Sequence, residues 1–439
     1  MGDRHPGWGG WALTVYGYVI ASSIGCTGTG GYPSGSDTSI FAALGLAAET
    51  VPAESEGNDS FAAATLFEIR QNERTSVGGT IDSSGDIDVF DLGPVNAGDH
   101  LSLDVFGDGV LDAVAALFDA DANLIYLNDD RSFFSQLVDP HIDVVLRRNT
   151  ERCYLAVASS PGASTQGRYR LEATLTPDFA RPEPVPQTVL LNFDGASGIE
   201  FAGRAAVDIP PFEAGAVSET LIGETESLAG LVLEAVRDDF VGLDVDVYSS
   251  RGEPPPETDI TVIHFGAYDP KLLGVAENID EFNERTVQEA IVFTDTFSVF
   301  NVLDPSIEDY AQALANVASH EIGHLLGLVH TADETGLMDI TASLRQLMRD
   351  QVFSVSPLES FTMPLGFQDA PATLVDSVGG DLQTLRARSA AHSRATKLWT
   401  ADEHADHGPV ARASATLSTC RCRGFGVTPV QSDALTDAR

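Results

Sequence analysis

Three histidines at a fixed spacing constrain this chain more than any other feature. His320 and His324 are four residues apart, so on an α-helix they lie on one face and can reach a single metal ion. His330 comes six residues later and would rotate away from that face if the helix continued. Gly327 can adopt the left-handed backbone that ends a helix and turns the chain back. The spacing therefore predicts a helix that ends near Leu326 and a turn that returns His330 to the other two.

The same residues predict a zinc site that leaves one position for water. Zinc prefers nitrogen, oxygen or thiolate ligands in a tetrahedron, and a catalytic site keeps one position open. The three histidines supply three ligands, and no cysteine or aspartate stands at a fixed motif spacing to close the fourth position. Glu321 adjoins the first ligand, where a carboxylate can take a proton from water held by the metal. Zn²⁺ is therefore the expected cofactor, with Glu321 as the catalytic residue.

This pattern also resembles that of a known family. Together the residues spell HExxHxxGxxH, and Met338 follows eight residues later within Gly336-Leu337-Met338-Asp339. The segment resembles the metzincin clan of zinc metalloproteases over about residues 188–366. The resemblance implies an endopeptidase of extracellular proteins in which Gly327 and Met338 support the three histidine ligands. Ile340 stands where some members carry an auxiliary tyrosine, so we expect a site without one.

The resemblance further implies how a substrate binds. A peptide would lie extended along an edge strand beside the zinc helix and add a strand to the sheet. The segment Gly274–Ile279 is the candidate for that rim. The segment Leu344–Met348 is the candidate for the C-terminal helix of the clan.

Residues 58–176 have a different pattern. Short alternating runs such as Leu101–Phe106 and Ala113–Phe118 are divided by Gly, Asp and Asn, with turn signals about every ten residues. This predicts an antiparallel β-sandwich. The runs Asn58-Asp59-Ser60, Asp86-Ile87-Asp88-Val89-Phe90 and Gly167-Arg168-Tyr169 resemble the bacterial pre-peptidase C-terminal domain. That resemblance implies a non-catalytic module that accompanies secreted peptidases.

A proline-dense segment separates two domains. Pro182, Pro184 and Pro186 predict a stiff, extended linker over residues 177–187. Beyond it strands alternate with helices, including a long helix over 218–240 and a zinc helix that begins at Asp304-Pro305. The predicted fold class is multidomain: an all-β sandwich, then an α+β metzincin-like catalytic domain over 188–370 with a mixed twisted sheet and a zinc-binding helix. Residues 380–439 lack sustained periodicity and are expected to be disordered.

The N-terminus predicts export. Residues 1–25 carry a short apolar stretch after Arg4, typical of a secretory signal, and residues 26–57 suggest a flexible tether. Gly25-Cys26 resembles a bacterial lipoprotein cleavage box, although Ser23 stands where Leu is usual. Two outcomes stay open: a secreted protein, or a cell-surface or outer-membrane lipoprotein anchored through Cys26. Membrane contact is expected only through that anchor.

Charge limits the partners. The chain has 65 acidic and 25 basic residues, a formal net charge of −40, which disfavours binding to the phosphate backbone of nucleic acids. The expected partners are protein or peptide substrates, and the expected state is a monomer. Acidic loops at Asp82, Asp86 and Asp88, and at residues 119–130, are candidates for Ca²⁺ or for solvated turns.

A second class of function stays open. The chain is alternatively a non-catalytic surface adhesin or binding protein, with a structural or degenerate zinc site and recognition by the sandwich. A structural zinc site is closed by a fourth protein ligand. Because no such ligand is offered at a motif spacing, the sequence favours the enzyme.

Overall fold

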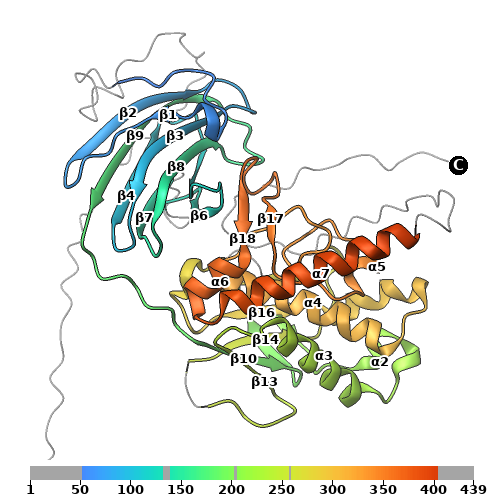
Figure 1. Cartoon of the computed structure of the whole chain (residues 1–439). Coiled ribbons are helices and arrows are strands. Elements are labelled where there is room, and N and C mark those ends of the chain that lie inside the picture. The colour runs from blue at the N-terminus through green and yellow to red at the C-terminus, as the bar shows by residue number, and fades with distance from the viewer. Residues whose placement is uncertain (1–51, 132–138, 202–204, 257–258, 404–439) are drawn as a thin grey trace, which may run out of the picture. The chain divides into compact units, whose positions relative to one another are not determined.

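The computed structural model describes residues 52–131, 139–201, 205–256 and 259–403 (Figure 1). The predicted signal segment 1–25, Cys26, residues 27–51 of the tether and residues 404–439 of the predicted tail lie outside the described residues. Within the described part of the chain, no helix is long and apolar enough to cross a membrane.

The first half forms the predicted β-sandwich. One sheet has the strand order β1-β3-β8-β5-β6 and the other β2-β9-β4-β7. All neighbouring strands are antiparallel except β1 and β3, which pair in parallel. The elements are the 3-10 helix η1 (Phe61–Ala63), β1 (Thr65–Leu66), β2 (Arg74–Ile81), β3 (Ile87–Val95), β4 (His100–Gly107), β5 (Ala113–Phe118), β6 (Leu124–Asn128), β7 (His141–Val145), β8 (Thr150–Ser159) and β9 (Gly167–Thr176).

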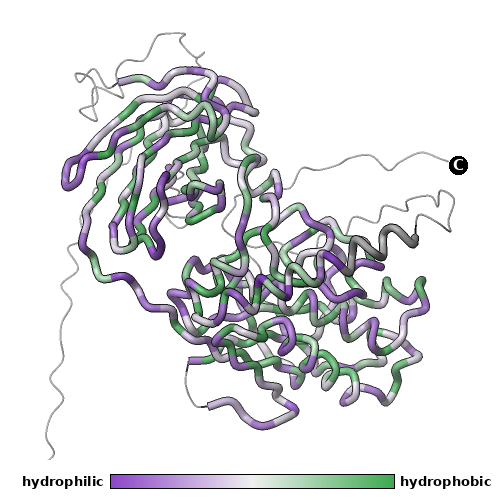
Figure 2. Tube along the Cα trace, in the orientation of Figure 1, coloured by the Kyte–Doolittle hydropathy of each residue, from purple (hydrophilic) through white to green (hydrophobic). Residues whose placement is uncertain are grey.

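Burial along the strands explains the sandwich. In β4 alternate residues are buried, because one face packs on the core and the other meets solvent. Figure 2 shows hydrophilic residues gathering at the turns of this region. Strand β5 differs, because all six of its residues are buried and both of its faces must therefore be covered. Val114, Ala116 and Phe118 form an apolar cluster with Val329, Leu358 and Met363. Val329 directly precedes the third histidine, and Leu358 pairs with Thr331, which follows it.

The second half is built on the predicted mixed sheet. Its order is β13-β10-β14-β16-β15, in which only the edge strand β15 is antiparallel. Helices α3 and α4 pack with this sheet in one apolar cluster. The strands are β10 (Gln187–Asn192), β13 (Val245–Ser249), β14 (Thr261–Phe265), β15 (Gly274–Ala276) and β16 (Glu289–Val292), with two hairpins, β11 (Ala196–Ile199) with β12 (Val207–Ile209) and β17 (Val355–Pro357) with β18 (Phe367–Asp369). The helices are α2 (Ala214–Val217), α3 (Thr225–Asp239), α4 (Ile307–Leu325), α5 (Leu344–Leu347), α6 (Ala370–Val378) and α7 (Leu382–Glu403), with the 3-10 segments η3 (Glu219–Leu221), η4 (Glu281–Asn283) and η5 (Thr294–Leu303).

The zinc helix begins two residues later than predicted. Ser306, not Asp304, is its N-cap, and Ser306 and Asp309 form a reciprocal capping box. Asp304 instead has a left-handed backbone with φ +51° at the end of η5. The Asp-Pro pair was a plausible start, but the capping box satisfies two backbone N–H groups at once.

The predicted helix over 218–240 is also shorter. Residues 219–221 form the 3-10 turn η3, and Gly223 has φ +92°, which separates that turn from α3. Helix α3 begins at Thr225. The apolar spacing alone did not reveal this break, because Leu221 is buried like the residues of the helix that follows.

The tail predicted to be disordered contains a helix. Helix α7 occupies residues 382–403, and α6 precedes it, so the catalytic region continues past the predicted end at residue 370. Leu374, Val378 and Leu385 belong to the apolar cluster that contains α3, α4 and the mixed sheet. Alanine and arginine are strong helix formers, so α7 needs few apolar contacts. The lack of apolar periodicity was therefore misleading.

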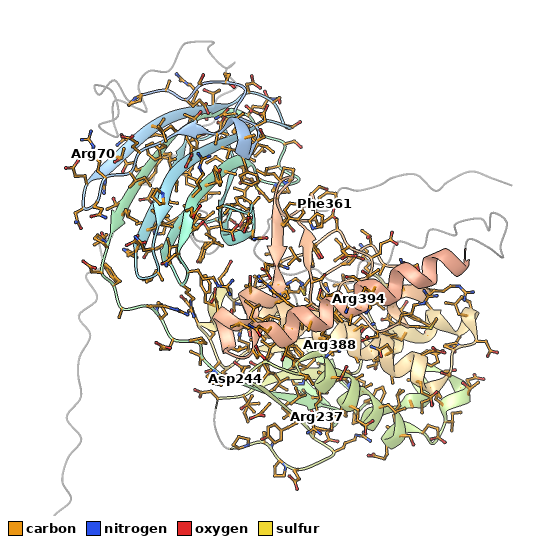
Figure 3. All side chains as sticks on the ribbon, in the orientation of Figure 1. Arg70, Arg237, Asp244, Phe361, Arg388 and Arg394 are labelled. Carbon is orange, nitrogen blue, oxygen red and sulfur yellow. The ribbon has the colours of Figure 1, made fainter. Side chains whose placement is uncertain are left out.

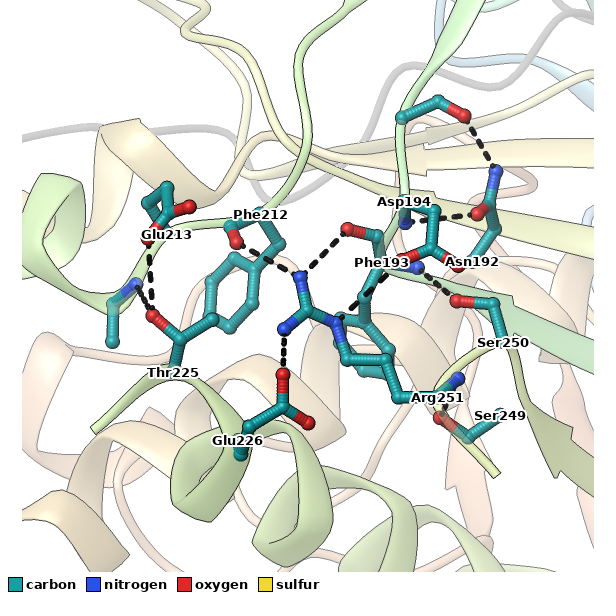
Figure 4. A network of polar contacts seen from close by, with 12 residues as sticks. Asn192, Phe193, Asp194, Phe212, Glu213, Thr225, Glu226, Ser249, Ser250 and Arg251 are labelled. Atoms are coloured by element: carbon teal, nitrogen blue, oxygen red, sulfur yellow. Dashed lines mark hydrogen bonds and ion pairs between the residues drawn. The ribbon is translucent and has the colours of Figure 1, made fainter. Parts of the chain in front are cut away.

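Arg251 fixes the edge of the catalytic sheet where several elements meet (Figure 4). Its guanidinium donates to the carbonyls of Phe193 and Phe212, each at 3.3 Å, and pairs with Glu226 of α3. These contacts connect the end of β10, the start of α2 and the first turn of α3.

Helix α7 is held to α3 by charge. Figure 3 labels Arg388 on α7, and its guanidinium lies 2.6 Å from Asp238 and 3.3 Å from Asp239. Asp239 is buried and also accepts a hydrogen bond from Ser319, at 2.7 Å. Burial raises the pKa of Asp239 to about 8, although Ser319 and Arg388 act in the opposite direction.

We predict a pH-dependent effect of Asp239→Asn on stability. The folded-state pKa lies above the unfolded value of about 3.9, so stability is greatest below about pH 4 and falls as the pH rises towards 8. The asparagine variant lacks this loss. Its melting temperature should therefore gain on that of the parent as the pH rises from 4 to 8. If the melting temperatures of the two proteins changed with pH by the same amount across this range, the raised pKa of Asp239 would be contradicted.

Candidate metal centre

The zinc helix ends at the predicted glycine. Gly327 has φ +95°, and its N–H donates to His324 O at 3.0 Å while Leu328 N–H donates to Gly323 O at 2.9 Å. These two bonds are the Schellman pattern for a helix that ends in a left-handed residue. A non-glycine residue there would cost roughly 1–2 kcal/mol in backbone strain. A Cβ would also lie only 3.0 Å from Asp280 O.

The turn brings the three histidines together. His324 Nε2 lies 3.0 Å from His320 Nε2 and 3.1 Å from His330 Nε2. Two ligands at about 2.05 Å from zinc in a tetrahedron are roughly 3.3 Å apart. The three ring nitrogens therefore fit one zinc ion with only a small outward adjustment.

The histidines are arranged as neutral ligands. His320 Nδ1 donates to Leu337 O at 2.6 Å, and His324 Nδ1 donates to Leu328 O at 2.7 Å, which leaves both Nε2 atoms free to bind a metal. Burial lowers the pKa of His320 to about 4 and that of His330 to about 3. Burial, with the neighbouring histidines, lowers the pKa of His324 well below its usual value. All three rings are thus neutral near pH 7, as a metal site requires.

The segment around Met338 supports this centre from below. Leu337 supplies the carbonyl for His320, and Met338 O accepts a hydrogen bond from Thr331, next to His330. Met338 is buried, and its Sδ would lie 2.6 Å from a Cβ added at Gly323, between the first two ligands. Met338 therefore lies against the helix at the centre of the ligand set.

Glu321 is buried beside the edge strand. It shares α4 with the first two histidines, and a Cβ added at Gly274 of β15 would collide with its carboxylate. Gly274 opens the segment predicted as the substrate rim. The structure thus brings the predicted catalytic carboxylate and the predicted rim into direct contact.

Sequence reasoning missed the groups that cap the end of α4. Asp280 N–H donates to His324 O, Gln288 Nε2 to Leu325 O and Ser377 Oγ to Leu326 O, each at 3.0 Å. These three donors come from segments distant in sequence, so no local pattern indicated them. Asp333 accepts hydrogen bonds from the N–H and the hydroxyl of Thr335 within a turn.

A second group of possible metal ligands lies in the sandwich. Among the described residues, Glu56, Asp82 and Asp86 place carboxylate oxygens within 4.8 Å of one another. Glu56 was not predicted. Asp88, predicted with Asp82 and Asp86, is fully buried, and its Oδ1 has no hydrogen-bond partner in the described part of the chain. The other acidic loop is a turn, because Asp119 accepts from the N–H groups of Asp121 and Asn123.

We predict that Gly323→Ala weakens metal binding. The new methyl would meet Met338 Sδ at 2.6 Å, and displacing Met338 would shift the histidines beside it. Support of this kind is typically worth 10–100-fold in metal affinity, so the zinc Kd should rise at least roughly tenfold, measured by chelator competition. Gly230→Ala on α3 is the matched control, because its methyl meets nothing within 4 Å and should leave the Kd unchanged. Equal zinc affinities for both variants would exclude the proposed role of Met338.

Comparison with known proteins agrees with this geometry. Residues 147–356 match the Matrixin family model, and the match begins within the sandwich, just before β8. No curated protein matches the chain.

Three solved structures are similar to parts of the chain. They are archaemetzincin from Methanopyrus kandleri (19% identity, 39% of this chain and 89% of that chain, TM-score 0.22), a zinc-dependent peptidase from Methanocorpusculum labreanum (13%, 37% and 93%, 0.23) and the pre-peptidase C-terminal domain of a Bacillus anthracis collagenase (13%, 25% and 94%, 0.20). The family match covers the whole ligand motif and the Met338 turn. Residues 147–356 thus carry a matrixin domain, a zinc metallopeptidase domain of the metzincin type.

Proposed function

We propose that the protein is an endopeptidase that cleaves extracellular proteins, with His320, His324 and His330 as zinc ligands and Glu321 as the general base. The observation that carries this proposal is the meeting of three neutral imidazoles with a buried carboxylate on the helix that bears two of them. A merely structural zinc site would have no need of Glu321 next to an edge strand.

The chemistry divides between the metal and the protein. Zinc, when bound, supplies a Lewis acid that polarises the scissile carbonyl. Glu321 takes a proton from the attacking water and then delivers it to the leaving amine. The Leu337 and Leu328 carbonyls hold His320 and His324 in the required tautomer and orientation.

The edge strand β15 offers a place for the substrate. Leu273 O accepts from Phe293 and Glu277 N–H donates to Glu289, so these residues face β16. In an antiparallel ladder the backbone groups of Gly274 and Ala276 then face away from β16. A peptide that pairs with them would lie beside Glu321, because Gly274 adjoins its carboxylate.

Export is part of the proposal. We place the mature protein outside the cytoplasm as a monomer, either secreted or anchored through a lipid on Cys26. The apolar stretch within residues 1–25 and the Gly25-Cys26 junction support this. Mass spectrometry of the mature N-terminus would distinguish a lipidated Cys26 from a free one.

We predict that Glu321→Gln abolishes most cleavage while zinc stays bound. Loss of a general base typically costs 10²–10⁴-fold, so kcat/KM for a casein-derived peptide should fall by roughly that factor. Zinc content, measured by atomic emission, should match that of the parent. Glu308→Gln is the matched control, an exposed carboxylate on the first turn of the same helix. Normal cleavage by the Glu321 variant would refute the mechanism.

We also propose that the sandwich binds Ca²⁺ at Glu56, Asp82 and Asp86. A divalent ion would offset the repulsion among these carboxylates and that from the buried Asp88, which interacts electrostatically with Asp86. Burial and the nearby Glu54 raise the pKa of Asp88 to about 9 when no ion is present. Oxygen-only donors of this kind suit calcium better than zinc.

Calcium should therefore raise the unfolding temperature of the full chain. At a concentration 100 times its Kd, a ligand of the folded state stabilises by about 2.7 kcal/mol, which corresponds to several degrees. Asp86→Asn should remove most of this gain, and Asp143→Asn, an acidic residue on β7, should retain it. Calorimetry with and without 5 mM EGTA, at roughly millimolar calcium, measures the difference. No shift in the parent would exclude the calcium site but leave the zinc site untouched.

A further inference from the structure

A loop of the catalytic region connects the β-sandwich with the zinc helix. Phe282 lies in η4, between β15 and β16 of the catalytic sheet, yet its side chain belongs to the core cluster of the sandwich. Its ring lies 6.3 Å from that of Tyr126 on β6, and the Arg147 guanidinium carbon lies 4.4 Å above it. Phe282 is 8% exposed. A residue of the catalytic region thus fills a position in the core of the other domain.

The backbone of this loop is strained. Phe282 has φ +65° and Asn283 φ +53°, a left-handed conformation that bulky side chains rarely adopt. Such a conformation persists only where the surroundings hold it. The contacts with Tyr126 and Arg147 are suited to do this, together with a hydrogen bond of 2.9 Å from Asn283 Nδ2 to Val185 O.

The same loop caps the zinc helix. Asp280, two residues before Phe282, donates its N–H to the carbonyl of the ligand His324. A Cβ at Gly327 would lie 3.0 Å from Glu281 Cα and 3.1 Å from Phe282 N, so the loop packs directly on the turn that returns the third ligand. The Asp280 side chain also accepts from Gln288, which donates to Leu325 O.

Two further contacts lead from the sandwich to the same turn. Arg147 donates to Asp376 O at 2.5 Å, and the neighbouring Ser377 donates to Leu326 O. Val329, next to the third ligand His330, is buried in the cluster formed by the outer face of β5. Residues 324–329 are therefore held from the sandwich side at three separate points.

We propose that the β-sandwich is a structural part of the metal centre, and that Phe282 is the positioning residue that connects the two. Its ring, fixed by Tyr126 and Arg147, holds the loop that sets the end of α4 and hence the places of His324 and His330. The sandwich thereby tunes metal affinity without touching metal or substrate.

The test uses the full chain and measures metal binding. Phe282→Ala and Tyr126→Ala should each raise the zinc Kd by 10–100-fold, the range for groups that orient metal ligands, in competition with a chromophoric chelator. The visible spectrum of the Co²⁺-loaded protein should change in both variants, because the ligand geometry changes. Tyr126→Phe keeps the ring against Phe282 and should restore the parent Kd.

Matched variants separate positioning from general stability. Phe67→Ala removes an aromatic ring from the same sandwich core, where it pairs with Phe90 at 6.0 Å. It should lower the melting temperature but leave the zinc Kd within twofold of the parent. If Phe282→Ala fails to fold, Phe282→Gly removes the same ring and suits the positive φ. Zinc affinity and cobalt spectra unchanged in the Phe282 and Tyr126 variants, or lost equally in Phe67→Ala, would overturn the proposal.

A kinetic measurement adds a second readout. In the Phe282 variant kcat should fall more than KM rises, because the metal ligands shift while β15 stays in place. The kinetic measurement rests on the proposed peptidase function, whereas the measurement of zinc affinity does not depend on it. An inactive parent that still shows the Phe282 effect on zinc Kd would therefore refute the function and leave this inference standing.

Discussion

The rest of the site depends on how α4 ends. Its last carbonyls belong to His324, Leu325 and Leu326, which lie beyond the regular α-helical bonds and accept hydrogen bonds from the turn and from other segments. Gly327 begins the left-handed turn, and Asp280, Gln288 and Ser377 supply the outside donors. If the helix continued for one more turn, His330 would leave the other histidines and three ligands would become two.

Close packing on two sides holds the residues of the metal centre in place. Met338 packs against Gly323 from below, while Gly274 adjoins Glu321 from the side of β15. Both contacts need glycine because a methyl would displace a functional group. The backbone carbonyls of Leu328 and Leu337 then fix two ring orientations. Close packing of this kind converts a sequence motif into a defined ligand geometry.

Because β5 is buried on both faces, the sandwich does not behave as a separate module. In a module that only accompanied the peptidase, the outer face of the sheet would be polar and exposed to solvent, as in most antiparallel sheets. Here Val114, Ala116 and Phe118 are fully buried in a cluster that includes Val329, the residue before the third histidine. The family match that begins at residue 147, inside the sandwich, is consistent with a region that does not divide cleanly at the proline-rich linker.

Features set by residues close together in the chain were predicted correctly more often than features set by contacts between distant residues. The position of Gly327 was predictable because it follows from helix geometry and the spacing of three residues. The start of α4 was misplaced because Asp304-Pro305 and Ser306 are both plausible caps, and only the reciprocal bond with Asp309 decides between them. Helix α7 was missed because its stability rests on helix-forming residues and on contacts such as Arg388 with Asp239, far apart in the chain.

By itself the sequence determined the chemistry: three imidazoles, a carboxylate, a glycine and a methionine at spacings that suit one zinc ion. It also determined the alternating pattern of the sandwich and the mixed pattern of the catalytic sheet, because both are local periodicities. Only the tertiary structure decided what holds the ligands in place. Asp280 and Phe282 reach the end of α4 from one loop and Ser377 reaches it from another segment, while Tyr126 of the sandwich contacts Phe282. Contacts between residues so distant in the chain leave no periodicity or motif in the sequence.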